Sequence, residues 1–292
     1  MKINVKCLIL FLLTTTIIFS GCKDDAQAPE IYFLNSDGDV VTSNQMDTTI
    51  LLYTVYSDPG ISVEDNVSDS EDIIVESDII EVLLTNTYGQ VRTCGTYTVT
   101  YSATDEALNV GTATKEIIVE NVAIPFTGSY STNRTNSEIA ETTYNSTISA
   151  DSRISGRLLF PKVYAQQIGE VSSYFKLAAD LYSPDYSTQF SETIAYTGTS
   201  ADKETPFFST ISYASALETI LEFDLLKIDA QEFTDDLGNE VQIAGRELDN
   251  LPLSRIEYVS GTKEISKIVL ELNVTFNGVP DDNVIEVYTP ND

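Results

Sequence analysis

The 292-residue sequence has no histidine and no tryptophan, and it contains only 3 cysteines. Without histidine the chain cannot form a Ser-His-Asp or Cys-His catalytic group, a histidine-ligated zinc site or an imidazole pH switch. Basic residues are also scarce, because 16 Lys and Arg stand against 45 Asp and Glu, for a formal net charge of −29. A charge of this sign repels phosphate backbones, so we expect no nucleic-acid partner.

Sequence signatures of catalysis are missing as well. The chain has no Gly-rich phosphate loop, no CxxC pair and no nucleophile elbow. Two carboxylates could hydrolyse glycosides without histidine, but among 45 acidic residues no feature selects a pair. We therefore expect a protein that is not an enzyme, and a carboxylate-dependent hydrolase is the weakest alternative.

The first 21 residues have the pattern of a secretory signal peptide. Lys2 and Lys6 form a basic head, an apolar run follows at residues 7–19, and small residues come after it. An apolar helix of this length rises only about 20 Å, which is too short for a bilayer core of roughly 30 Å. We expect residues 1–21 to be removed during export.

A cysteine stands where the signal peptide ends. The segment Phe19-Ser20-Gly21-Cys22 resembles the lipobox of bacterial lipoproteins, and the resemblance implies cleavage before Cys22 and acylation of its thiol. Acyl chains such as palmitate contribute on the order of 0.8 kcal/mol per buried CH₂, so several chains anchor a protein firmly. The alternative is an ordinary signal peptide followed by an incidental cysteine. With Cys7 removed and Cys22 acylated, Cys94 is the only thiol of the processed chain.

Lys23, Asp24 and Asp25 follow this cysteine directly. They resemble the export tag of Bacteroidetes lipoproteins that are displayed on the cell surface. The resemblance implies a lipid-anchored location in the outer membrane, facing outward. The alternative is that residues 22–29 form only a solvated acidic tether.

From residue 31 onward, short alternating runs between turn residues indicate an all-β chain. The clearest strand is predicted at residues 96–104, with Tyr97, Val99 and Tyr101 on one face. A turn at residues 105–109 and a partner strand at residues 111–119 complete a hairpin rich in β-branched residues.

Two sequence blocks in this half carry a family resemblance. Residues 58–66 read D-P-G-x-x-x-x-D-N, and residues 95–109 read G-T-Y-x-V-x-Y-x-A-x-D-x-x-x-N. Together they resemble a bacterial immunoglobulin-like domain, of a branch named after an insecticidal crystal toxin. The resemblance covers about residues 30–121 and implies a β-sandwich that serves as a spacer or adhesion module. Two departures are Cys94, where the family usually has proline, and Leu108, where it usually has glycine.

Residues 121–125 are expected to form a linker, and residues 126–292 show further alternating segments. We predict a second all-β domain there, either a sandwich or an up-and-down barrel, with one or two helical turns at residues 214–220. The whole layout resembles uncharacterised lipoproteins of Bacteroidetes.

An acidic loop is the first candidate binding site. Eight carboxylates fall between Glu64 and Glu81 with no Lys or Arg among them. Ca²⁺ prefers such oxygen ligands, and its candidate ligands here are Asp65, Asn66, Asp69 and Asp72. The loop lacks the spacing and the glycine of an EF-hand, so a solvated loop without a cation is the favoured alternative.

Tyrosines form the second candidate site, because exposed rings can stack on sugars. Tyr182 and Tyr186 flank a Pro-Asp turn that would present both rings. The alternative is that these tyrosines are half-buried residues of a sheet.

The sequence thus predicts a non-enzymatic lipoprotein of the outer-membrane surface. Its Ig-like domain would act as a spacer that presents a C-terminal binding or interaction domain, whose partner is either a glycan or a surface or outer-membrane protein. The alternative is a glycan-binding accessory lipoprotein of a polysaccharide-uptake system.

Overall fold

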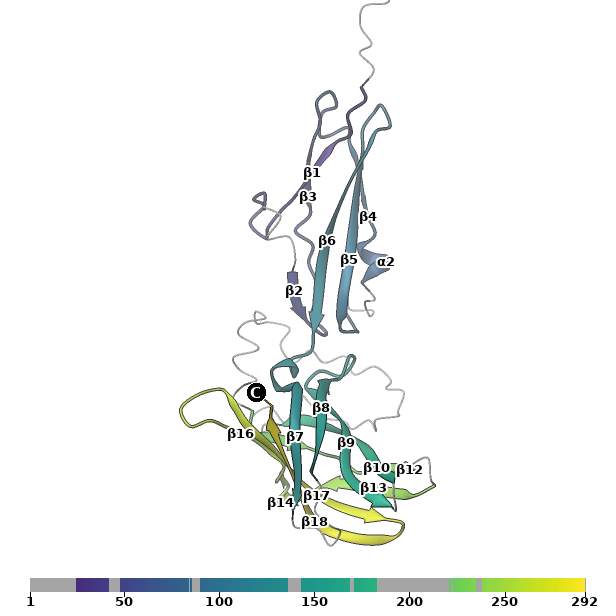
Figure 1. Cartoon of the computed structure of the whole chain (residues 1–292). Coiled ribbons are helices and arrows are strands. Elements are labelled where there is room, and N and C mark those ends of the chain that lie inside the picture. Colours follow the sequence, from purple (N-terminus) through teal and green to yellow (C-terminus); the bar gives the residue numbers. More distant parts are fainter. Residues whose placement is uncertain are drawn as a thin grey trace, which may run out of the picture. The chain divides into compact units, whose positions relative to one another are not determined.

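Figure 1 shows a computed structural model of the chain. The structure describes residues 25–41, 48–83, 85, 90–135, 143–168, 171–182, 221, 223–234 and 238–291. In these residues nearly every regular element is a strand, and the one α-helix, α2 (Ile79–Val82), is four residues long. The prediction of an all-β chain is therefore confirmed. The helical turns predicted at residues 214–220 lie outside the described residues.

No helix in the described part of the chain has the length and apolar character that a membrane span requires.

The chain forms two compact units, each built from several segments. Unit 1 comprises Met1–Met46, Asp58–Val82 and Thr98–Glu116, and unit 2 comprises Asp47–Ser57, Leu83–Tyr97 and Ile117–Asp292. The predicted domain limits, 30–121 and 126–292, stay predictions.

The N-terminal strands form two sheets. In the smaller sheet, β1 (Glu30–Phe33) pairs antiparallel with β3 (Ile61–Glu64). The larger sheet has the order β2-β6-β5-β4. Its strands are β2 (Thr48–Leu51), β6 (Val110–Glu120), β5 (Gly95–Thr104) and β4 (Ile74–Ser77). The predicted hairpin is confirmed as β5 and β6.

The alternation of β5 decides which of its side chains enter the interior. Val99, Tyr101 and Ala103 are buried, and the residues between them are more exposed. The Tyr101 ring packs edge-on against Phe33 of β1, with ring centroids 5.4 Å apart. This contact joins the larger sheet to the smaller one across the core of unit 1.

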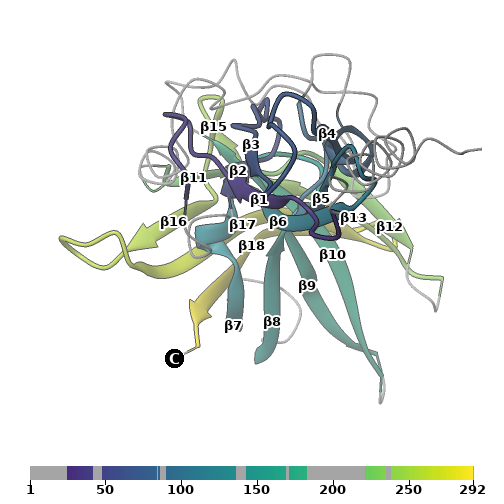
Figure 2. The same ribbon diagram turned by 90° about the horizontal axis from the view of Figure 1, so that it is seen from above.

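Unit 2 contains a sheet that closes on itself. Eight strands follow one another as antiparallel neighbours, and the last of them, β18, pairs with both β17 and β7. Four of them, β7 to β10, lie side by side in Figure 2. The ring consists of β7 (Gly128–Thr135), β8 (Thr143–Ala150), β9 (Arg157–Ile168), β10 (Val171–Tyr182), β11 (Leu225–Lys227), β16 (Arg255–Tyr258), β17 (Ile265–Phe276) and β18 (Val279–Pro290). Of the two predicted alternatives, the closed sheet corresponds to the up-and-down barrel.

Four short strands are inserted between β11 and β16. They are β12 (Gln231–Thr234), β13 (Glu240–Gly245), β14 (Glu247–Leu248) and β15 (Leu251–Pro252). β13 pairs with the second half of β17, beyond the part that β16 covers. The side-chain amide of Gln231 then bonds to β10 as a peptide group would: its Nε2 donates to the Ala178 carbonyl at 2.8 Å, and its Oε1 accepts from the Ala178 N–H at 3.0 Å.

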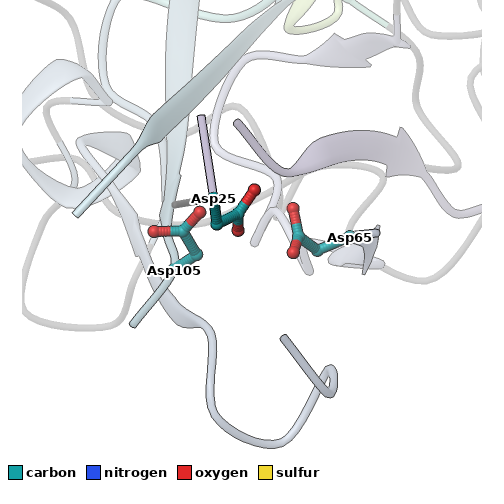
Figure 3. Close-up of side chains that lie close together, drawn as sticks. All are labelled: Asp25, Asp65 and Asp105. Carbon is teal, nitrogen blue, oxygen red and sulfur yellow. The ribbon is translucent and has the colours of Figure 1, made fainter. Parts of the chain in front are cut away.

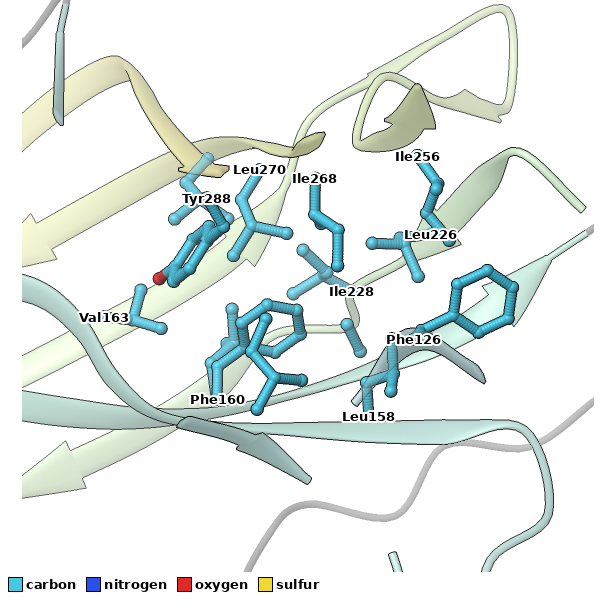
Figure 4. Packing of buried hydrophobic residues seen from close by; sticks show 14 of the residues in the cluster. Phe126, Leu158, Phe160, Val163, Leu226, Ile228, Ile256, Ile268, Leu270 and Tyr288 are labelled. Atoms are coloured by element: carbon cyan, nitrogen blue, oxygen red, sulfur yellow. The ribbon is translucent and has the colours of Figure 1, made fainter. Parts of the chain in front are cut away.

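Apolar side chains fill the interior of the ring. Leu158 and Phe160 of β9, Leu226 of β11 and Ile268 of β17 point toward one another in Figure 4 and are almost completely buried. Truncating such a side chain to alanine typically costs about 2–5 kcal/mol, so this core dominates the stability of unit 2.

The segment expected to be a linker is buried within unit 2. Val122, Ala123 and Phe126 are each at most 1% exposed. The Asn121 amide donates to the carbonyls of Asp151 and Ile154 at 2.6 and 2.7 Å. Its Oδ1 accepts the N–H groups of Ala123 and Gly156. Every hydrogen-bonding position of this amide is therefore used, and the segment is fixed in place.

Candidate metal centre

Three aspartates from distant parts of the chain meet in unit 1. Asp25 precedes β1, Asp65 follows β3 and Asp105 follows β5. One carboxylate oxygen of each lies within 4.8 Å of the others, and the three side chains converge in Figure 3.

The turn between β5 and β6 fixes Asp105. The Asn109 N–H donates to Asp105 Oδ1 at 2.7 Å, and Asn109 Nδ2 donates to Oδ2 at 2.8 Å. Asp105 is only 3% exposed. The same Nδ2 also donates to the Asp25 carbonyl at 3.2 Å, so Asn109 holds two of the three aspartates together.

The backbone after β3 fixes Asp65. Its Oδ2 accepts the N–H groups of Ser68 and Val67 at 2.8 and 2.9 Å. These bonds stabilise the ionised form, so the pKa of Asp65 lies below its ordinary value. With Oδ2 used in this way, Oδ1 is the oxygen left for a partner.

A glycine allows the residues after Asp25 to run close to β6. A Cβ placed on Gly111 would overlap the Pro29 carbonyl oxygen. Only a residue without a side chain permits this approach, which brings residues 25–29 against the start of β6.

Two oxygens of this cluster have no hydrogen-bond partner. Asp25 Oδ2 and Asp65 Oδ1 are excluded from solvent, and within the described residues neither accepts a hydrogen bond. A carboxylate oxygen removed from water without a donor is strongly disfavoured, and two of them beside a third carboxylate are more so. The chemistry that such a group of oxygens performs best is the binding of a hard cation.

The cluster contains one of the residues proposed from the sequence as calcium ligands. Asp65 belongs to it, whereas Asn66, Asp69 and Asp72 lie on the exposed loop that follows. Asp69 and Asp72 are ends of a turn there, where the Asp72 N–H bonds to the Asp69 carbonyl. From the sequence, Asp25 is expected in the export tag, and Asp105 is expected only in the turn between two strands. The sequence feature that could have pointed to Asp105 as a site residue is its place with Asn109 in the second sequence block.

Among the other proposed site residues, the described part of the chain includes Tyr182. Tyr182 ends β10, is half-buried and pairs with Leu225 of β11. Its proposed partner Tyr186 lies outside the described residues, as do Cys22, Lys23 and Asp24.

A second polar group of unit 1 has a structural role. Lys115 Nζ lies 2.6 Å from Asp58 Oδ1, and the Tyr101 hydroxyl donates to Asp58 Oδ2 at 2.8 Å. Burial acts to raise the pKa of Asp58, but the bonds from Lys115 and Tyr101 outweigh it and lower the pKa. Asp58 opens the first sequence block and Tyr101 belongs to the second, so this contact joins the two blocks in space.

Unit 2 has an interior polar group. Glu286 is fully buried and accepts bonds from the hydroxyls of Tyr144 and Tyr288 and from the Tyr164 N–H. Arg134 lies directly opposite Glu286 across the β7–β18 pairing, and its guanidinium sits 4.9 Å from the Tyr164 ring centre. Burial raises the pKa of Glu286, the three bonds offset part of that effect, and they link β8, β9 and β18.

No protein-family model matches the chain, and no curated protein matches it. The chain is similar to the crystal structure of the lipoprotein BT2262 from Bacteroides thetaiotaomicron, at 12% sequence identity and a TM-score of 0.24. That match covers 89% of this chain and 99% of the other. A TM-score this low does not establish a shared fold or a shared function.

Proposed function

We propose that the chain is a non-enzymatic lipoprotein, anchored through Cys22 in the outer membrane and facing the cell surface. Its N-terminal half serves as a spacer, and the closed sheet of unit 2 carries the surface that binds a partner. The Phe19-Ser20-Gly21-Cys22 motif at the end of an apolar signal is the observation that carries the proposal.

The position of Asp25 supports this arrangement. Asp25 comes three residues after Cys22, and its carbonyl already accepts a hydrogen bond from Asn109 of unit 1. A hydrogen bond to unit 1 is therefore made three residues after the proposed acylation site.

Anchoring is tested by replacing Cys22 with Ser and separating cell membranes from soluble fractions. The variant should leave the carbonate-washed membrane fraction or accumulate as the uncleaved precursor. A processed variant that still sediments with washed membranes would show that Cys22 is not the anchor.

Surface display is tested separately with Asp24→Ala and Asp25→Ala, because Asp25 also belongs to the aspartate cluster. A working export tag predicts reduced protease accessibility on whole cells for both variants, with acylation intact. Unchanged protease accessibility in Asp24→Ala would show that the tag does not direct surface display.

Glycan binding is the second candidate function. Tyr182 supports it, because this ring is half-buried at the end of β10 rather than enclosed in the core. Binding to a polysaccharide panel that is lost in Tyr182→Ala with Tyr186→Ala would favour a glycan-binding accessory protein. The buried Tyr288→Phe variant serves as a matched control that alters a tyrosine of the core.

A further inference from the structure

We propose that Asp25, Asp65 and Asp105 bind a Ca²⁺ ion, which fastens the start of the processed chain to unit 1. Binding itself does not depend on acylation, whereas its consequence for the membrane anchor rests on the proposed function.

Two independent observations support a cation at this place. The first is convergence, because oxygens of three carboxylates from three segments lie within 4.8 Å of one another. The second is the pair of solvent-excluded oxygens without a hydrogen-bond donor, Asp25 Oδ2 and Asp65 Oδ1, which stand beside the 3%-exposed Asp105. A cation supplies the missing partner for both oxygens and removes the repulsion among three negative charges.

The ligand set also selects the kind of ion. All of the ligand atoms are carboxylate oxygens, which suit hard cations rather than the metals that prefer nitrogen or sulfur. Two oxygens on one Ca²⁺ can lie at most about 5 Å apart, whereas two oxygens on one Mg²⁺ can lie at most about 4.2 Å apart. Oxygens that lie within 4.8 Å of one another are close enough for a single Ca²⁺ to draw all three into its coordination shell.

The hydrogen bonds around the cluster orient its ligands. Backbone N–H groups hold Asp65 through Oδ2, and the Gln27 N–H donates to Asp25 Oδ1 at 3.2 Å. Each of these bonds leaves the second oxygen of the same carboxylate for the ion. Outer bonds of this kind position ligands at metal sites generally.

The site has three carboxylate ligands, and the side chains of Asp25 and Asp65 are partly exposed, so we infer a modest affinity. We expect a dissociation constant in the range of extracellular calcium modules, about 10⁻⁴ to 10⁻³ M. The site would then be filled outside a cell and stripped by a chelator. Because Asp25 is three residues from Cys22, a bound ion would hold unit 1 next to the acylated residue.

The test uses the chain from residue 22 onward with Cys22→Ser, treated with EDTA and titrated with CaCl₂ in a calorimeter. We expect one Ca²⁺ per chain and a melting temperature that rises beyond the effect of NaCl at equal ionic strength. Asp25→Asn should weaken binding at least about tenfold, and Asp65→Asn should do the same. Asp69→Asn removes an acid from the same loop outside the cluster, and it should bind as the parent chain does.

The difference in melting temperature between Asp25→Asn and the parent chain should change sign when Ca²⁺ is added, and this separates a cation site from general charge effects. Without Ca²⁺, Asp25→Asn should melt at or above the parent chain, because one repelling charge is gone. In several millimolar Ca²⁺ the parent should melt higher than Asp25→Asn. The proposal is overturned if Ca²⁺ does no more than NaCl, if Asp25→Asn keeps the parent affinity, or if Asp69→Asn loses as much affinity as Asp25→Asn. None of these outcomes affects the fractionation test of Cys22, so the two proposals fail separately.

Discussion

Lys115 and Asp58 form an ion pair inside unit 1, with Nζ 2.6 Å from Oδ1. Lys115 is 5% exposed, and its ammonium lies 5.1 Å from the Tyr101 ring centre and 5.8 Å from that of Phe33. The charge of a buried lysine is disfavoured unless it is paired, and here one carboxylate and two aromatic faces compensate it. The pair therefore connects the first sequence block to β6, an element that lies outside both blocks.

Lys115→Met should destabilise the protein by about 2–3 kcal/mol, because it leaves the Asp58 carboxylate without its cation. Urea unfolding followed by circular dichroism measures the loss. Lys263→Met, at an exposed lysine, is the control and should change little. A double variant with Asp58→Asn should recover part of the loss, and strict additivity would mean that the two residues do not interact.

The contribution of Asp58 should depend on pH. Its pKa in the folded chain is lowered from the ordinary 3.8, because bonds from Lys115 and Tyr101 outweigh burial. A depressed folded pKa adds stability that is present above about pH 3.8 and is lost as the pH falls through the folded value. The stability difference between the parent and Asp58→Asn should therefore be constant at pH 5–7 and shrink below pH 4. A difference that grows on acidification would contradict the assignment.

Asn121 should be among the most sensitive polar residues of unit 2. Asn121→Ala removes four hydrogen bonds. The Asp151 carbonyl loses the Asn121 donor, and the Ile154 carbonyl keeps only the longer bond from the Arg157 N–H. We expect a loss of about 3 kcal/mol in thermal or urea unfolding, because buried polar groups left unpaired cost more than a lost bond. Asn273→Ala, at an exposed position of β17, is the matched control.

Leu108 occupies a backbone conformation that suits glycine. Its φ is 68°, in the left-handed region, and its side chain is exposed. Leu108→Gly should raise stability by about 0.5–1 kcal/mol, because the steric cost of this conformation exceeds the added flexibility of glycine. Leu108→Ala keeps the steric cost and should give no gain in melting temperature. An equal gain in both variants would place the cause in the exposed side chain.

Cys94 should be unreactive in the folded chain. Burial, with smaller effects from Asp151 and Glu120, raises the pKa of its thiol to about 12. In the Cys22→Ser chain from residue 22 onward it is the single thiol. Its reaction with a thiol-disulfide reagent at pH 8 should be at least about a hundredfold slower than after unfolding in urea. Equal rates would show that the thiolate forms readily in the folded state.

Much of the local structure could be predicted from the sequence. The β5–β6 hairpin follows from the alternation around Val99 and Tyr101, since every second side chain of a strand faces the same side. The burial of residues 121–125, the segment expected to be a linker, does not follow from the sequence pattern. Its proline and the change in pattern mark a break between strands, but only its neighbours in space bury Val122 and satisfy Asn121.

The sequence by itself determined the strand content, the acidic charge, the signal-like N-terminus and the two motif blocks, because each of these depends on residues close together along the chain. Only the tertiary structure decided which distant strands pair and which side chains meet. β18 joins β7 across about half of the chain, and Asp25 meets Asp65 and Asp105, which follow it 40 and 80 residues later. Alternation tells a strand which face to bury but not which partner to choose, since any edge offers the same backbone donors and acceptors. The choice depends on how all the buried faces pack at once, and the aspartate cluster is a product of that packing.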